Sequence, residues 1–330
     1  MSLFARLRPR ARPFLVLALA LAAHSALGSP LSQCIGFTAT DRVLIVDAAE
    51  VGVQPDIDAA AFALLDQGLI QTLSVIPTGP DFDNVARMAR ERGLQVGLEI
   101  TLTNEWQDKL PWRTVLPRDQ VPSLYRNDTQ LWADTEHLGA HATRQDVLRE
   151  MLAQIGKARD AGLKISHIQS HRMFWRANPE IMKLYLALPA ETGIPLVAQM
   201  YELPFDRQMT RNLNGQRAGV ITPDASVMLY DPAERLADRR YTGYDELLPL
   251  LPSGVTHLSI HPARPNPQNR EALPDMSMRV SDYKLWSDGS LQKLANKLGI
   301  KTIDFSPLKV LQNKVDAGTN TCLGGVASVR

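Results

Sequence analysis

The sequence has only two cysteines among its 330 residues, few aromatic residues and no marked excess of either charge. The formal net charge is +1, and much of the positive charge lies in the N-terminal segment "RLRPRARP". A near-neutral chain lacks the basic surface that binds polyanions, so we expect no nucleic-acid partner. No G-x-G-x-x-G motif follows the first predicted strand, which argues against a dinucleotide-binding fold.

Residues 1–28 have the pattern of a secretory signal peptide. A basic segment precedes the apolar run from Phe14 to about Ala23, and the small residues Ala26 and Gly28 come before Ser29. The apolar run is well short of the ~20 residues that a membrane-spanning helix needs. We therefore expect cleavage after residue 28, a periplasmic or secreted protein, and no stable membrane insertion after cleavage.

Both cysteines belong to the predicted mature chain, Cys34 near its start and Cys322 near its end. An oxidising compartment favours a disulfide between two such cysteines. The ends of a domain often lie close together, which makes a Cys34–Cys322 bridge feasible. Two free thiols are the alternative, and a metal-binding pair is a more remote one.

Strand-like and helical segments alternate along residues 29–330. The predicted strands "RVLIVD", "TLSVI" and "KISHIQ" are rich in Val, Ile and Leu, and each precedes a helical pattern that ends at a glycine. Apolar strands joined by helices are typically parallel and buried on both faces. We predict one α/β domain over residues 29–330, a TIM-like (β/α) barrel of mainly parallel strands with long rim loops. A doubly wound sheet is the alternative.

Two long segments interrupt this alternation, Thr103 to His141 and Tyr201 to about Gly243. Loops of that length in a compact domain usually build or cover a binding site. Both contain aromatic residues, among them Trp106 in the first segment. Aromatic rings on a barrel rim suit sugar rings, although packing of the loop on itself is at least as good an explanation.

Polar residues stand at the ends of several predicted strands. In a (β/α) barrel the carboxyl ends of the strands meet at one mouth, so these side chains should converge there. Two carboxylates and an imidazole could hold a divalent cation, and a further histidine could act as acid or base. Capping, ion pairing and hydrogen bonding inside the core are the structural alternatives, and they suit His167 and His257 best because both lie within strands. The candidate residues are Asp47, Glu50, Glu99, His171 and His261.

The same segments resemble the YdjC-like (ChbG/HpnK) carbohydrate deacetylases. "DAAEVG" is similar to the N-A-D-D-F-G that ends the first strand in this family, and "VGLEITLT" is similar to V-G-[LV]-H-L-x-L-T. "QIGKARDAGLKISHIQSH" is similar to a helix–strand unit that ends in [HY]-x-D-x-H, and "GVTHLSIHPA" and "LGIKTIDFSPL" resemble the closing segments. The resemblance covers nearly all of residues 42–308.

The resemblance implies a TIM-like barrel that removes acetyl groups from N-acetylated amino sugars with the help of a divalent metal ion. The metal ligands of the family, one Asp and two His, correspond here to Glu50, Glu99 and His171. The late catalytic histidine corresponds to His261. Asp224 matches an acidic position in the second half of the chain, and we expect it to bind the substrate together with Trp106, the rim-loop residue named above.

The chain departs from the family pattern at the catalytic base, where Ala49 replaces an aspartate. Loss of a general base costs ~10²–10⁴-fold in rate unless another group replaces it. Asp47 is the catalytic carboxylate that we predict, with Glu50 and Glu99 as alternatives. Two glutamates and one histidine form a harder ligand set than the family's, so Mn, Mg or Ca is favoured over Zn.

Three hypotheses therefore remain at the level of sequence. The first is an exported, metal-dependent deacetylase-like hydrolase with a remodelled site. The second is a catalytically inactive barrel that binds a glycan through the same mouth. The third is a barrel with two carboxylates that cleave a glycosidic bond.

Overall fold

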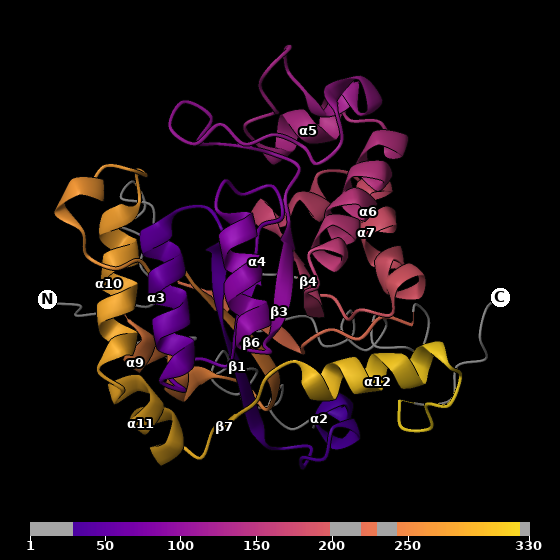
Figure 1. Ribbon diagram of the computed structural model, residues 1–330. Coiled ribbons are helices and arrows are strands. Elements are labelled where there is room, and N and C mark those ends of the chain that lie inside the picture. Colours follow the sequence, from indigo (N-terminus) through magenta and orange to yellow (C-terminus); the bar gives the residue numbers. More distant parts are fainter. Residues whose placement is uncertain (1–28, 199–218, 230–242, 324–330) are drawn as a thin grey trace, which may run out of the picture.

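The structure is a computed structural model that describes residues 29–198, 219–229 and 243–323 (Figure 1). Residues 1–28 and most of the segment from Tyr201 to Gly243 lie outside these ranges, so the predicted signal peptide and second long loop are not part of the description. The described strands pair in parallel in the order β4-β3-β2-β1-β6-β5, with β7 beside β1. They are β1 (Arg42–Val51), β2 (Thr72–Val75), β3 (Gln95–Ile100), β4 (Lys164–Ser170), β5 (Ala225–Met228), β6 (Gly254–Ile260) and β7 (Lys301–Thr302).

The sheet curls into a barrel. The backbone N–H of Val197 donates to the carbonyl of Ile168 on β4 at 2.7 Å, and that of Leu196 donates to Ile221 at 3.1 Å. These hydrogen bonds connect β4 to residues 194–198, and residues 194–198 to residues 219–222. Residues 219–222 lead into β5, which pairs with β6. Because β6 pairs with β1, the described strands form a closed ring, which confirms the predicted TIM-like (β/α) barrel.

Helices alternate with the strands and cover the outside of the barrel (Figure 1). Their starts follow from local capping: the Gln54 side chain accepts hydrogen bonds from the first N–H groups of α3, and Pro55 occupies the first helical position. None of the described helices is long and apolar enough to cross a membrane. The α-helices are α2 (Pro30–Cys34), α3 (Pro55–Asp66), α4 (Phe82–Glu91), α5 (Thr135–His141), α6 (Arg144–Asp160), α7 (Pro179–Thr192), α9 (Tyr244–Leu247), α10 (Met276–Ser287), α11 (Ser290–Lys297) and α12 (Ser306–Asp316). The 3₁₀ turns are η1 (Arg118–Gln120), η2 (Pro122–Leu124), η3 (His171–Arg176), η6 (Leu248–Leu250) and η7 (Pro267–Asn269).

The end of the barrel where β1 begins is closed by α2 and α12, which lie side by side at the bottom of Figure 1. Leu31 of α2 packs there in an apolar cluster with Val43 of β1 and Leu308 of α12. Cys34 and Cys322 form a disulfide that joins residues 288 positions apart, as the sequence predicts. The two ends of the described domain are therefore tied together on the face opposite the mouth.

The first long loop, residues 103–141, lies at the carboxyl end of β3 and forms one side of the mouth together with α5 (Figure 1). The buried Glu150 of α6 holds it in place, because its carboxylate accepts hydrogen bonds from the N–H groups of Val115 and Leu116 at 2.8 and 3.1 Å. The indole of Trp112 donates to the carbonyl of Thr103 at 3.3 Å. The loop is thus anchored to the barrel by buried polar contacts.

Candidate functional site

The carboxyl end of β1 has an irregular backbone that turns Glu50 into the mouth. Side chains alternate along a strand, so Asp47 and Ala49 share the inward face and Glu50 would point the other way. The register of β1 against β2 shifts between Ala48 and Val51, and Glu50 has a φ of 60°. Such a bulge with a left-handed residue re-aims a side chain at a cost in backbone strain, which is common at functional sites.

Glu50, Glu99 and His171 converge at this point, and we call them the mouth cluster. One ligand atom from each lies within 4.8 Å of the other two, and all three residues are buried. His171 Nδ1 is 3.1 Å from Glu99 Oε1 and 3.5 Å from Glu50 Oε1. The Glu50 N–H also donates to Glu99 Oε2 at 2.8 Å, which fixes the two carboxylates relative to each other.

Glu105, in the loop after β3, holds the other side of the His171 ring. Its carboxylate oxygens are both 3.1 Å from His171 Nε2, and Arg172 lies 3.6 Å from the same carboxylate. A carboxylate on the outer nitrogen of a histidine is the arrangement that orients metal-bound imidazoles in proteins. It leaves Nδ1 directed at Glu50 and Glu99, so the mouth cluster fits a divalent cation.

Arg279 of α10 is a fully buried cation beside the mouth cluster. Its guanidinium forms an ion pair with Glu50 and is held from the other side by Asp275, at 2.9 Å from Nε and 2.8 Å from Nη2. The guanidinium carbon also lies 5.4 Å from the ring centre of Trp106, within cation–π range. One oxygen of Glu50 is therefore paired with Arg279, while the other faces His171.

His261, at the end of β6, completes this part of the mouth. Its Nε2 lies 3.9 Å from Glu50 Oε1, and its backbone N–H donates to Asp282 of α10 at 2.9 Å. Asp282 accepts a second hydrogen bond from the Tyr244 hydroxyl at 2.8 Å. Burial raises the pKa of Asp282 to about 6, and these two donors oppose the rise.

Burial and neighbouring charges move the pKa values of the site in different directions. Burial alone would raise the pKa of Glu50, but the Arg279 charge, with His261 and His171, holds it below its ordinary value. Burial raises the pKa of Glu99. Burial opposes protonation of His171, but Glu105 and the other carboxylates outweigh it and raise the pKa of His171 well above the usual value.

The pKa values of Glu105 and His261 are also shifted from their ordinary values. Burial would raise the pKa of Glu105, but the charge and hydrogen bond of His171, together with the Arg172 charge, outweigh burial and lower it. Burial lowers the pKa of His261, and the Arg279 charge adds to that effect. The pKa values of the two imidazoles at the mouth are therefore shifted in opposite directions, that of His171 upward by the carboxylates and that of His261 downward by burial.

The structure brings most of the predicted site residues together. Glu50, Glu99, His171 and His261 meet at the mouth, and the Trp106 ring lies 5.8 Å from that of His171. Trp106 is almost buried, with 7% of its surface exposed, so it forms part of the wall of the site.

Asp47 and Asp224 lie elsewhere. Asp47 is fully buried one layer below the mouth and is bonded to Ser74, His167 and His257, so the structure does not bring this predicted catalytic carboxylate to the mouth cluster. Asp224 lies at the opposite end of the barrel, where its carboxylate accepts hydrogen bonds from the Val255 N–H and the Ser29 hydroxyl at 2.8 and 2.6 Å. The predicted substrate contact of Asp224 therefore does not fit its position, because its role is to hold the N-terminal segment against the start of β6.

Sequence reasoning missed Glu105, Asp275 and Arg279. Glu105 stands directly before Trp106 in a loop that the sequence already predicts to border the mouth. Its position could therefore have identified it as a candidate site residue. Arg279 and Asp275 carry the i, i+4 spacing of an ordinary helical ion pair, and such pairs are usually solvated. Only the structure shows that the Arg279 guanidinium is completely buried against Glu50.

Known proteins resemble this chain in sequence and in fold. The family model described as YdjC-like protein matches residues 43–297. A carbohydrate deacetylase of Listeria monocytogenes serotype 4b is 30% identical over 277 residues, which cover 80% of this chain and 99% of that protein. A carbohydrate deacetylase of Enterococcus faecalis is 26% identical over 159 residues, and that match spans only 48% of this chain and 58% of the relative.

Among solved structures, one from Enterococcus faecalis V583, described as a cellobiose-phosphate cleavage protein, superimposes with a TM-score of 0.69 at 22% identity. It covers 82% of this chain and 99% of the other. At that level of identity the likeness concerns the fold, which matches the barrel described above.

Proposed function

This chain belongs to the YdjC-like protein family, and from that premise we propose that it is an exported, metal-dependent deacetylase of N-acetylated amino sugars. The observation that carries the proposal is the convergence of Glu50, Glu99 and His171 at the barrel mouth, with ligand atoms within 4.8 Å of one another. The curated relatives in this family that match the chain are carbohydrate deacetylases, which supports the substrate class.

The residues of the mouth cluster would hold the cation. A divalent ion bound there would supply positive charge that polarises the acetyl carbonyl and activates a water molecule. Two carboxylate ligands and one imidazole favour a hard cation such as Mn²⁺ or Mg²⁺ over Zn²⁺. Glu105 fixes the ring of His171 from its outer nitrogen, and Arg279 keeps Glu50 ionised and confines one of its oxygens.

His261 is the proton carrier in this proposal. Its Nε2 lies 3.9 Å from Glu50 Oε1, and its backbone N–H is held by Asp282. Hydrolysis of an amide requires removal of a proton from water and delivery of a proton to the leaving amine. Since Ala49 cannot accept a proton, we assign both transfers to Nε2 of His261.

Two further observations support export. Residues 1–28 have the pattern of a secretory signal peptide, and Cys34 is bonded to Cys322. Structural disulfides persist in oxidising compartments and are rare in the cytosol. We therefore propose that the protein acts in the periplasm or outside the cell.

The proposed activity is tested by measuring acetate released from short N-acetylglucosamine oligomers in the presence of Mn²⁺. We expect release by the unmodified protein and a loss of at least about 100-fold in His261→Ala and Glu99→Ala. His137→Ala, which removes an exposed imidazole, is the matched control and should retain full activity. Release that survives in both site variants would contradict the assigned residues.

Ala49 favours one alternative function, a barrel that binds glycans without hydrolysing them, because it removes the family's base. Oligomer binding without acetate release in any divalent metal would support that alternative and contradict the deacetylase proposal. Isothermal titration with the same oligomers separates the two outcomes.

A further inference from the structure

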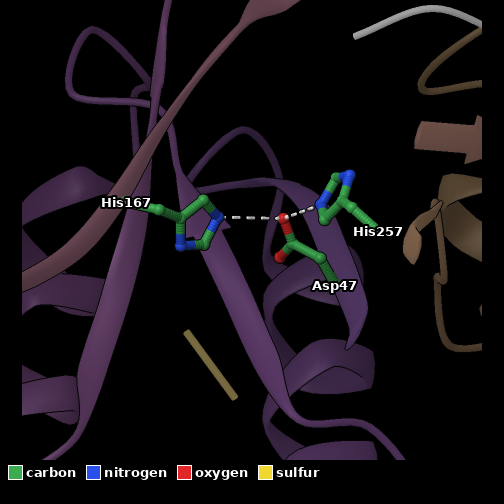
Figure 2. Close-up of side chains that lie close together, drawn as sticks. All are labelled: Asp47, His167 and His257. Atoms are coloured by element: carbon green, nitrogen blue, oxygen red, sulfur yellow. Dashed lines mark hydrogen bonds and ion pairs between the residues drawn. The ribbon is translucent and has the colours of Figure 1, made fainter. Parts of the chain in front are cut away.

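A second polar cluster lies inside the barrel below the mouth. Four residues are completely buried there: Asp47 of β1, Ser74 of β2, His167 of β4 and His257 of β6. Figure 2 shows the two imidazoles on either side of Asp47, each directing a nitrogen at the same carboxylate oxygen. We call these four residues the inner cluster.

The contacts in the inner cluster are crowded onto one atom. Asp47 Oδ2 lies 2.7 Å from Ser74 Oγ, 3.0 Å from His257 Nε2 and 3.3 Å from His167 Nε2. Its other oxygen, Oδ1, is buried and has no hydrogen-bond partner in the part of the chain that the structure describes. A carboxylate oxygen accepts about two hydrogen bonds, so three contacts on Oδ2 exceed its usual capacity while Oδ1 accepts none from the described residues.

The spacing is that of a ligand shell. Atoms that bind one ion at about 2.0–2.2 Å lie roughly 3.0–3.5 Å apart from their neighbours in the shell. The separations of Asp47 Oδ2 from the two Nε2 atoms, 3.0 and 3.3 Å, fall in that range, as does the 3.1 Å from Ser74 Oγ to His167 Nε2. Ser74 Oγ is closer to Asp47 Oδ2, at the hydrogen-bond distance of 2.7 Å, and the three Asp and His ligand atoms lie within 4.8 Å of one another. We propose that the inner cluster is a structural binding site for a divalent transition-metal ion, with Zn²⁺ as the best match to its imidazole and oxygen ligands.

The surroundings of both histidines suit this role. His167 Nδ1 lies 2.9 Å from the Ser166 hydroxyl, and His257 Nδ1 lies 3.1 Å from the Ser226 hydroxyl. A partner on the outer nitrogen fixes the tautomer that leaves Nε2 free to bind a metal. Phe305 stacks on His167 with ring centres 3.6 Å apart and shields the cluster from water.

Charge gives an independent argument. A carboxylate that is completely buried is normally paired with a cation or bound to a metal, because burial of an isolated charge is costly. Among the described residues no lysine or arginine forms an ion pair with Asp47, and its charged-group contacts are the two histidines. A divalent ion would compensate this charge and would link β4 to β1, which are separated by β3 and β2 in the sheet.

The inner cluster and the mouth cluster share no ligand, so their occupancy can be measured separately. We would produce the protein in zinc-supplemented medium, dialyse it against EDTA and count the zinc by mass spectrometry. Because the inner cluster is buried, we expect one zinc per chain to remain in the unmodified protein and in Glu99→Gln, which disables the mouth cluster. Asp47→Asn should retain at least tenfold less zinc.

A second measurement keeps the test decisive if Asp47→Asn fails to fold. Crystals of the unmodified protein should give an anomalous peak at the zinc edge between Asp47 Oδ2 and the two Nε2 atoms. The proposal is overturned if no zinc survives EDTA in the unmodified protein, or if the retained zinc is lost in Glu99→Gln and lies at the mouth. Loss of deacetylase activity alone bears only on the mouth cluster.

Discussion

The carboxylate of Glu105 lies 3.1 Å from Nε2 of His171, on the side of the ring opposite Glu99. This contact joins the long loop after β3 to the start of η3. It also determines which nitrogen of His171 faces the mouth cluster. Glu105 is therefore a positioning residue for the proposed cation site, although it has no counterpart among the residues that sequence reasoning selected.

We predict that Glu105→Gln weakens Mn²⁺ binding about 10–100-fold, the usual effect of losing a carboxylate behind a metal-bound histidine. The glutamine keeps the size of the side chain but loses its charge. Isothermal titration with Mn²⁺ measures the change without depending on a substrate. The exposed Glu136→Gln is the control and should bind as the unmodified protein does, and equal affinity in both variants would argue against the role of Glu105.

Arg279→Met tests the buried ion pair with Glu50. Removal of Arg279 takes the buried cation away from both Glu50 and Asp275, and the loss of one partner of a buried ion pair typically costs about 3–5 kcal/mol in the free energy of unfolding. Urea denaturation should show this loss in Arg279→Met. The exposed pair of Arg87 and Glu91 offers a matched control, because Arg87→Met should cost no more than about 1 kcal/mol.

The double variant Glu50→Gln/Arg279→Met separates charge from packing. If the Glu50 charge causes part of the loss, neutralising Glu50 should recover that part of the stability, while the part that comes from Asp275, the second carboxylate on Arg279, should remain lost. A double variant as unstable as the sum of the two single variants would show that Arg279 acts through Asp275 or through packing against Trp106, rather than through Glu50.

Asp58 of α3 predicts a dependence of stability on pH. Its carboxylate accepts a hydrogen bond from the Gly52 N–H at 2.6 Å, and burial, with Asp81 nearby, raises its pKa to about 8. Since this value exceeds the ordinary 3.8, the folded protein keeps a proton that the unfolded chain has already lost. The free energy of unfolding should therefore fall as pH rises from about 4 to about 8, by at most about 1.4 kcal/mol per pH unit.

Urea midpoints at pH 6, 7, 8 and 9 check this prediction. Asp58→Asn mimics the protonated side chain and should lose the part of the decline that occurs between pH 6 and 8. The exposed Asp160→Asn should keep the full decline. If Asp58→Asn and the unmodified protein show parallel curves, Asp58 does not hold the proton.

Much of the fold could be predicted from the sequence because its signals are local. Runs such as Val43 to Val46 are apolar without alternation, and the helices that follow them end at glycines, so parallel strands joined by helices were the natural prediction. The meeting of Glu50, Glu99, His171 and His261 also followed from one rule, that strand ends converge at the mouth of a barrel.

Other parts of the site depend on geometry that a strand pattern does not contain. The inward turn of Glu50 comes from its φ of 60° and the shifted register beside it, which sequence alternation cannot show. Asp47 lies only three residues before Glu50. Its side chain points into the barrel below the mouth, where it contacts His167 and His257 of the inner cluster. Arg279 is distant in sequence from β1, and its burial depends on how α10 packs.

Ala49→Asp tests whether the missing base limits catalysis. Ala49 lies on the inward face of β1, between the inner cluster and Glu50, and is almost completely buried. In our proposal His261 performs both proton transfers, so a carboxylate at position 49 would take over the first and leave His261 to protonate the amine. General bases contribute about 10²–10⁴-fold, so even an imperfectly placed aspartate should raise acetate release at least about tenfold.

Ala49→Asn has the same shape without a base and should show no gain, while urea denaturation confirms that both variants are folded. If the two variants release acetate at the same rate as the unmodified protein, then proton removal at position 49 is not limiting, and His261 or a mouth carboxylate already supplies the base.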